Sequence, residues 1–137
     1  MLTIRESQMQ SLRHHSVAVF ESQLVDYLLS IAPPLRVATL ADFSPISALP
    51  PEIVKGLVGI CVRKGRGYGL TWQSSLAAFA VTMFAMAPNF DEHPIASQAL
   101  NDPEVPANGR VRHLLATLSD ADVKAIRANY QPSAWRI

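Results

Sequence analysis

The chain has 137 residues, of which 49% are hydrophobic, 17% charged and 7% aromatic. This length fits one domain with its own core, and the composition excludes wholesale disorder. Twelve lysines and arginines against eleven aspartates and glutamates leave a formal net charge of +1, which argues against a nucleic-acid-binding protein. The single cysteine, Cys61, excludes an intramolecular disulfide framework and a cysteine-based zinc site, and it favours a reduced, cytoplasmic compartment.

The first predicted element is one long amphipathic helix over about residues 4–31. Thr3 and Glu6 have the spacing of a capping box, which predicts a helix start and leaves no apolar run for an export signal. Pro33 and Pro34 end the helix, because proline supplies no N–H and pushes the preceding residue out of the helical region. The predicted buried stripe consists of Met9, Leu12, Ser16, Val19, Phe20, Leu24, Tyr27, Leu28 and Ile31.

Residues 35–50 are predicted to form a linker with at most one short helix, because prolines and polar residues interrupt every apolar period. A second helix is predicted from Pro51 to a stop at residues 64–67. Thr71 is expected to cap a third helix over about residues 72–86, which is apolar all round and therefore belongs inside the protein. Its uninterrupted apolar part is shorter than the roughly 20 residues that span a bilayer, so no membrane association is expected.

The last third of the chain is predicted to contain shorter helices. One begins at Pro94 and runs to about Leu100, a second covers residues 110–118, and Ser119 with Asp122 opens a third. Residues 131–137 are predicted to form a tail. No segment shows the alternation of apolar and polar residues that is typical of a half-buried strand. The prediction is a single all-α domain over residues 1–137, a bundle of five or six helices with a buried apolar central helix.

Two clusters invite a chemical interpretation. Asp91, Glu92 and His93 are residue types used in acid–base catalysis and metal binding, but a carboxylate of Asp91 or Glu92 is expected to cap the helix that begins at Pro94. The glycines at 65, 67 and 69 match neither a Walker loop nor a dinucleotide fingerprint, and they favour a helix stop with positive φ. We therefore expect no catalytic residue, no metal site and no cofactor, and the protein is not predicted to be an enzyme.

Two short motifs carry a family resemblance. They are Tyr68-Gly69-Leu70 and, about twenty residues later, Phe90-Asp91-Glu92-His93-Pro94. With the opening at residues 1–5 and the Leu100-Asn101-Asp102 element, the chain resembles small bacterial proteins whose genes lie in type VI secretion effector clusters. The resemblance implies a non-enzymatic co-chaperone or adaptor that binds another protein and helps to load an effector. An immunity protein that inhibits a cognate toxin is the alternative, and the oligomeric state is left open.

The aromatic residues near these motifs admit two roles. Tyr68 and Phe90 either lock the loops that flank the central helix or contact a partner, with the structural role favoured for Phe90. Trp135 either docks on the core or is offered to a partner. We predict a partner surface that includes Arg66, Tyr68, Trp135 and Arg136, and structural roles for Gly67, Gly69, Phe90, Asp91, His93 and Pro94.

Overall fold

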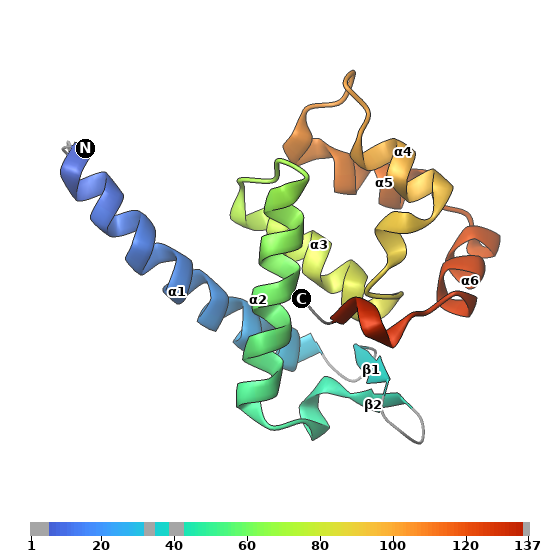
Figure 1. Ribbon diagram of the computed structural model, residues 1–137, viewed down its shortest axis with the longest axis horizontal. Coiled ribbons are helices and arrows are strands. Elements are labelled where there is room, and N and C mark those ends of the chain that lie inside the picture. The colour runs from blue at the N-terminus through green and yellow to red at the C-terminus, as the bar shows by residue number, and fades with distance from the viewer. Residues whose placement is uncertain (1–5, 32–34, 39–42, 136–137) are drawn as a thin grey trace.

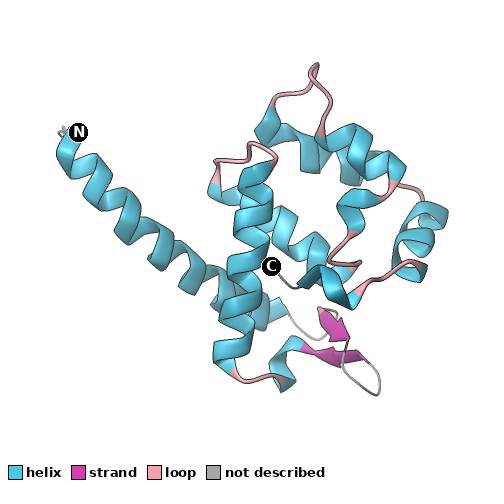
Figure 2. Cartoon of the chain, viewed as in Figure 1, coloured by secondary structure: helices cyan, strands magenta, loops and turns pink. Residues whose placement is uncertain are grey.

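The computed structural model of the protein describes residues 6–31, 35–38 and 43–135, with side chains described from Val19 onward. Figure 1 and Figure 2 show helices around a central one, with a small two-stranded ribbon at one end. The all-α prediction is confirmed. The helices are α1 (Glu6–Ile31), α2 (Pro51–Gly67), α3 (Gln73–Ala85), α4 (Pro94–Leu100), α5 (Arg110–Thr117) and α6 (Asp120–Ala128). Short 3₁₀ turns are η1 (Ile46–Ala48), η2 (Phe90–Glu92), η3 (Ala107–Gly109) and η4 (Pro132–Trp135).

The predicted absence of strands is wrong, because β1 (Arg36–Ala38) and β2 (Phe43–Pro45) pair as an antiparallel ribbon. Arg36 lies opposite Pro45 and Val37 opposite Ser44. Three residues per strand are too few for an alternating pattern to be visible in the sequence. The ribbon nevertheless positions buried side chains, because Val37 and Leu35 both pack into the core.

Helix α1 confirms only part of its predicted stripe. Phe20, Leu24 and Leu28 are buried, at spacings of four residues. Val19 and Tyr27 are 53% and 51% exposed, so their assignment to the buried face is wrong. Each precedes a buried residue and therefore points about 100° away from it around the helix axis. The predicted capping box at the start of this helix includes Thr3, which lies outside the described residues.

Helix α3 is the central, buried helix that the sequence predicts. Leu76, Phe79, Ala80 and Met83 are at most 1% exposed, and α3 runs through the middle of the molecule in Figure 1. Phe79 also meets Phe90, with ring centroids 5.0 Å apart. Among the helices of the described residues, none combines the length and apolar character that crossing a bilayer requires.

The contact between α2 and α3 depends on one glycine of α2. A Cβ atom built on Gly65 would lie 2.9 Å from Leu76 Cδ2, whereas a Cβ atom on Gly59 would meet nothing within 4 Å. The side chain of Leu76 is itself buried, so it has little room to move aside. The missing side chain at Gly65 therefore allows the two helices to approach closely.

Two alanine substitutions in α2 are expected to have opposite effects on stability. Gly59→Ala should raise the free energy of unfolding by about 0.5–1 kcal/mol, because alanine costs less backbone entropy in a helix. Gly65→Ala should instead lower it by about 1 kcal/mol or more, because the added methyl group displaces Leu76. Urea unfolding of the two variants measures the difference. Equal stabilisation by both substitutions would contradict the close packing at Gly65.

The start of α6 is the capping box that the sequence predicts. The Asp122 backbone N–H donates to Ser119 Oγ at 3.1 Å, and the Ser119 backbone N–H donates to Asp122 Oδ2 at 3.0 Å. The hydrogen bond from the Ser119 backbone, followed by that of the Ser119 side chain, holds the pKa of Asp122 below its ordinary value.

This lowered pKa predicts how acid affects the start of α6. The carboxylate of Asp122 stabilises the fold above its unfolded-state pKa, and this contribution is lost as the pH falls through the lower folded-state pKa. Ser119→Ala removes one of the two hydrogen bonds, so the pKa of Asp122 should rise part of the way to its ordinary value. An NMR titration of the Asp122 carboxyl group measures it, with Ser133→Ala in η4 as the control. An unchanged pKa in Ser119→Ala would contradict the role of the side chain.

Candidate protein-binding site

The turn between α2 and α3 brings together the residues of the first family motif. Helix α2 ends at Gly67, within the predicted stop at residues 64–67, and Gly69 alone among the described glycines has positive φ, at 87°. The Gly69 N–H donates to the Arg66 carbonyl oxygen at 2.9 Å, and the Leu70 N–H donates to that of Gly65 at 3.2 Å. The prediction of a positive-φ turn glycine is therefore confirmed for Gly69 and wrong for Gly65 and Gly67, which are helical.

The two motifs meet at a buried carboxylate. The Tyr68 hydroxyl donates to Asp91 Oδ2 at 2.6 Å, and Lys64 Nζ forms an ion pair with Asp91 Oδ1 at 2.7 Å. Lys64 Nζ, whose ammonium group has three N–H donors, also donates to the Pro88 carbonyl oxygen at 2.7 Å. The Asp91 side chain is 5% exposed and that of Lys64 is 27% exposed. Burial, reinforced by the hydrogen bond to Asp91, raises the pKa of Tyr68 well above its ordinary value.

This arrangement corrects the prediction of a carboxylate cap for α4. His93 occupies the N-cap position, and its Nδ1 accepts the Ile95 backbone N–H at 3.4 Å. Pro94 occupies the first turn of α4, where its missing N–H costs nothing. Asp91 is occupied by Lys64 and Tyr68, so it fixes the η2 segment to α2.

Both aromatic residues of the motifs contribute to the packing around α3. Phe90 is fully buried, which confirms the favoured structural role. Tyr68 is partly buried, and its ring centroid lies 5.9 Å from that of Phe79. The hydroxyl and much of the ring of Tyr68 are therefore engaged within the protein, while Arg66 is exposed beside the turn.

A side chain from a distant loop caps α3. The backbone N–H groups of Thr71 and Trp72 both donate to Asn108 Oδ1, each at 2.9 Å. Ser75 Oγ donates to the Asn108 carbonyl oxygen at 2.7 Å, and Asn108 Nδ2 donates to Thr71 Oγ1 at 3.0 Å. Trp72, not Thr71, holds the N-cap position, so the predicted Thr71 cap is wrong. No local pattern identifies Asn108, because it lies more than thirty residues away in the sequence.

The hydrogen bonds to Asn108 hold the backbone of an exposed tryptophan. Trp72 is 63% exposed, the largest exposed fraction among the large hydrophobic residues of the described part of the chain. It borders a shallow recess of about 160 Å³ that Asn108 and Arg112 also line. The sequence predicts Trp72 only as the start of a helix. The signal in the sequence for its exposure is an uncharged turn that ends in tryptophan.

The last described residue, Trp135, packs against the core. Trp135 is 7% exposed, its Nε1 donates to the Tyr130 hydroxyl at 2.8 Å, and its ring lies 4.8 Å from that of Phe84. Of the two alternatives for Trp135, docking is thus the one observed, and an exposed indole that serves as a partner anchor is not. Arg136, which was predicted to join the partner surface, lies outside the described residues.

The remaining candidates for chemistry are dispersed. No group of three or more histidine, cysteine, aspartate or glutamate side chains able to hold a metal occurs in the described part of the chain. Cys61 is fully buried, and this burial raises the pKa of its thiol far above the ordinary value. His113 is exposed on α5.

These features define a small helical domain that presents an exposed tryptophan, with Arg112 lining the same recess. Comparisons of the chain with family models, with curated proteins and with solved structures find no match.

Proposed function

We propose that the protein is a non-enzymatic accessory factor that binds an adaptor chaperone in the bacterial cytoplasm and helps to load a type VI secretion effector. The observation that carries the binding role is the exposed side chain of Trp72, on a backbone that Asn108 holds. The resemblance of the two motifs to proteins of effector clusters supplies the cellular role. The Tyr68–Asp91 hydrogen bond supports this use of the motifs, because it joins them in one contact.

Trp72 has the properties of an interface anchor. Tryptophan and arginine dominate the binding energy of protein interfaces, and both occur here, with Arg112 beside the indole and Arg66 exposed at the same turn. The backbone of Trp72 is already held by Asn108, so binding a partner costs little additional backbone entropy at this residue. An indole that remains in water in the free protein gains its full burial energy when a partner covers it.

An affinity pull-down from the native host, with mass spectrometry of the bound proteins, tests the cellular role. We expect an adaptor chaperone, alone or together with its effector. A toxin captured alone and tightly would replace the proposal with the immunity function. Failure to retain any protein would overturn a binding role and reopen the enzyme alternative of Asp91, Glu92 and His93.

A substitution at Trp72 tests the site itself. With the purified chaperone, Trp72→Ala should weaken binding by about 30-fold or more, as loss of a hot-spot residue does. The matched control is Tyr27→Ala, which removes another aromatic side chain that is 51% exposed but lies on α1. An unchanged affinity for Trp72→Ala would show that the partner binds elsewhere.

A further inference from the structure

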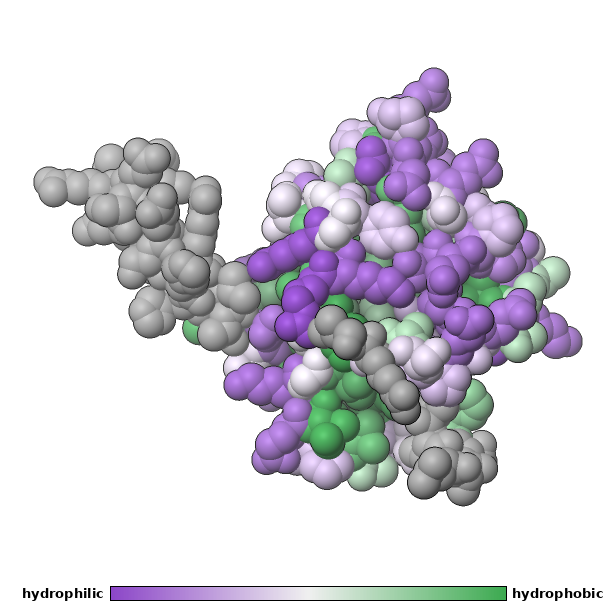
Figure 3. Space-filling model, in the orientation of Figure 1, coloured by the Kyte–Doolittle hydropathy of each residue, from purple (hydrophilic) through white to green (hydrophobic). Residues whose placement is uncertain are grey.

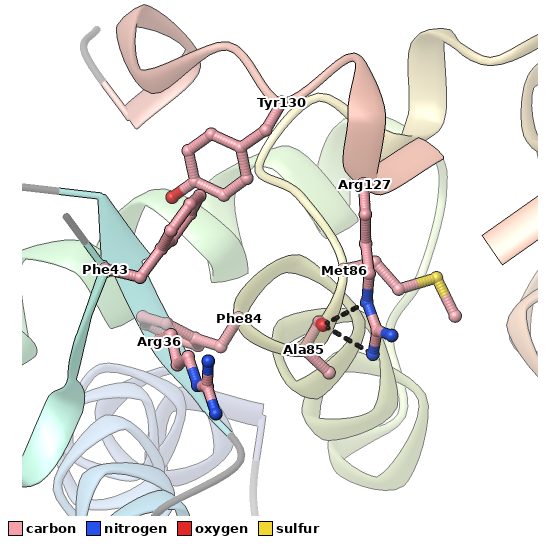
Figure 4. Close-up of a pocket in the computed structure, with 7 residues that line it drawn as sticks. All are labelled: Arg36, Phe43, Phe84, Ala85, Met86, Arg127 and Tyr130. Atoms are coloured by element: carbon pink, nitrogen blue, oxygen red, sulfur yellow. Dashed lines mark hydrogen bonds between the residues drawn. The ribbon is translucent and has the colours of Figure 1, made fainter. Parts of the chain in front are cut away.

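A second recess, of about 380 Å³, lies between the β1–β2 ribbon, the end of α3 and the residues around the end of α6 (Figure 4). Its volume falls at the lower end of the range of about 300–1,000 Å³ that is typical of ligand sites. No local pattern in the sequence indicates this recess, because its lining comes from four separate segments. It shares no lining residue with the recess beside Trp72.

One wall of the recess is aromatic. Phe43 of β2 meets Tyr130 edge to face, with ring centroids 5.0 Å apart and ring planes at 89°. Phe43 is 46% exposed, while Phe84, which also lines the recess, is buried against Trp135. An apolar side chain placed here would contact these rings and cover the exposed part of Phe43.

The recess is also positively charged. Arg36 and Arg127 both line it, and Figure 4 shows the two guanidinium groups on either side of Phe84 and Ala85. Arg127 donates from Nε and Nη2 to the Ala85 carbonyl oxygen, at 3.3 and 3.2 Å, which fixes the orientation of its guanidinium group. Neither arginine forms an ion pair with an aspartate or glutamate of the described residues, and none of the described residues that line the recess carries a carboxylate.

From this combination we infer that the recess binds a peptide segment of a partner protein in which a carboxylate lies next to an aromatic or large aliphatic side chain. The carboxylate would accept charge-assisted hydrogen bonds from the Arg36 guanidinium group and from the remaining N–H donors of Arg127. The apolar side chain would pack against the rings of Phe43, Tyr130 and Phe84. The inference does not depend on the type VI assignment, because it follows from charge and shape at a different site.

Fluorescence anisotropy with a labelled peptide tests this inference on the full chain. The probe is a ten-residue peptide with two aspartates on either side of one phenylalanine, with both ends blocked. The comparison peptide carries asparagine in place of each aspartate. We expect the acidic peptide to bind and the amide peptide to bind at least about tenfold more weakly, since charge-assisted hydrogen bonds are lost.

Variants locate the binding site. Arg36→Gln should weaken binding of the acidic peptide by about tenfold, whereas Arg63→Gln, which changes an exposed arginine of α2 outside the recess, should leave it unchanged. In the unaltered protein, the NMR signals of Arg36 and of the Arg127 Nε–H should shift on addition of the peptide. Equal binding of the two peptides, equal binding to both variants, or no binding would overturn the inference. Tighter binding of a mononucleotide to the same arginines would show that the recess is a phosphate site instead.

Discussion

Replacing Lys64 with methionine is expected to lower the free energy of unfolding by about 3–5 kcal/mol, as the removal of one partner from a buried ion pair does. Methionine keeps most of the length of the side chain but has no ammonium group. Asp91, whose side chain is 5% exposed, would then keep only the Tyr68 hydroxyl as a partner. The Pro88 carbonyl oxygen would also lose its donor. The loss of stability arises because the Asp91 carboxylate stays buried without its counter-charge. The net stabilisation that the intact ion pair provides is small by comparison.

A second substitution separates these two contributions. In the double variant Lys64→Met with Asp91→Asn, the residual charge is gone and the Tyr68 hydroxyl still has a carbonyl oxygen to bind. We expect this variant to be more stable than Lys64→Met alone, by about 1–3 kcal/mol. Chemical denaturation measures all three proteins, and Lys55→Met, at an exposed position of α2, is the control. If Lys64→Met is as stable as that control, the ion pair does not hold η2 to α2.

The sequence was sufficient for the helices but not for the contacts between them. The helical periodicity of α2 and α3 and the capping box at Ser119 depend on neighbours three or four residues apart, so they are visible in the sequence. The ion pair between Lys64 and Asp91 joins positions 27 residues apart, and nothing local distinguishes Asp91 from a helix cap. The same limit applies to Asn108, which replaces the predicted cap at Thr71.

The exposed aromatic side chain beside the α2–α3 turn is Trp72, whereas the sequence drew attention to Tyr68. Glycine, arginine and tyrosine at residues 65–69 indicated an exposed aromatic group, and the turn does present one. However, the Tyr68 hydroxyl is occupied by Asp91, and the exposed ring belongs to Trp72. Exposure depends on which side of the turn meets the core, and that is decided by the buried carboxylate 23 residues downstream of Tyr68.

Phe79→Ala is the second substitution with a large expected effect, a loss of about 3–5 kcal/mol. The Phe79 side chain is fully buried in α3, and its ring lies between Tyr68 of the α2–α3 turn and Phe90 of η2, with centroids 5.9 and 5.0 Å away. Its removal leaves a cavity that the surrounding helices cannot fill without moving. Because a domain of this size is stable by only about 5–15 kcal/mol, the variant should unfold at a much lower urea concentration.

The control for Phe79 is Leu115→Ala on α5, a large side chain that is 41% exposed, for which a change within about 0.5 kcal/mol is expected. Phe79→Leu fills part of the cavity and should lose less than Phe79→Ala, which keeps the comparison measurable if the alanine variant is largely unfolded. Because Phe79 supports Tyr68, the alanine variant should also loosen the Tyr68–Asp91 hydrogen bond, and the hydroxyl should then ionise at lower pH than in the unaltered protein. A Phe79→Ala protein with unchanged stability and unchanged tyrosine titration would show that the core is not organised around this ring.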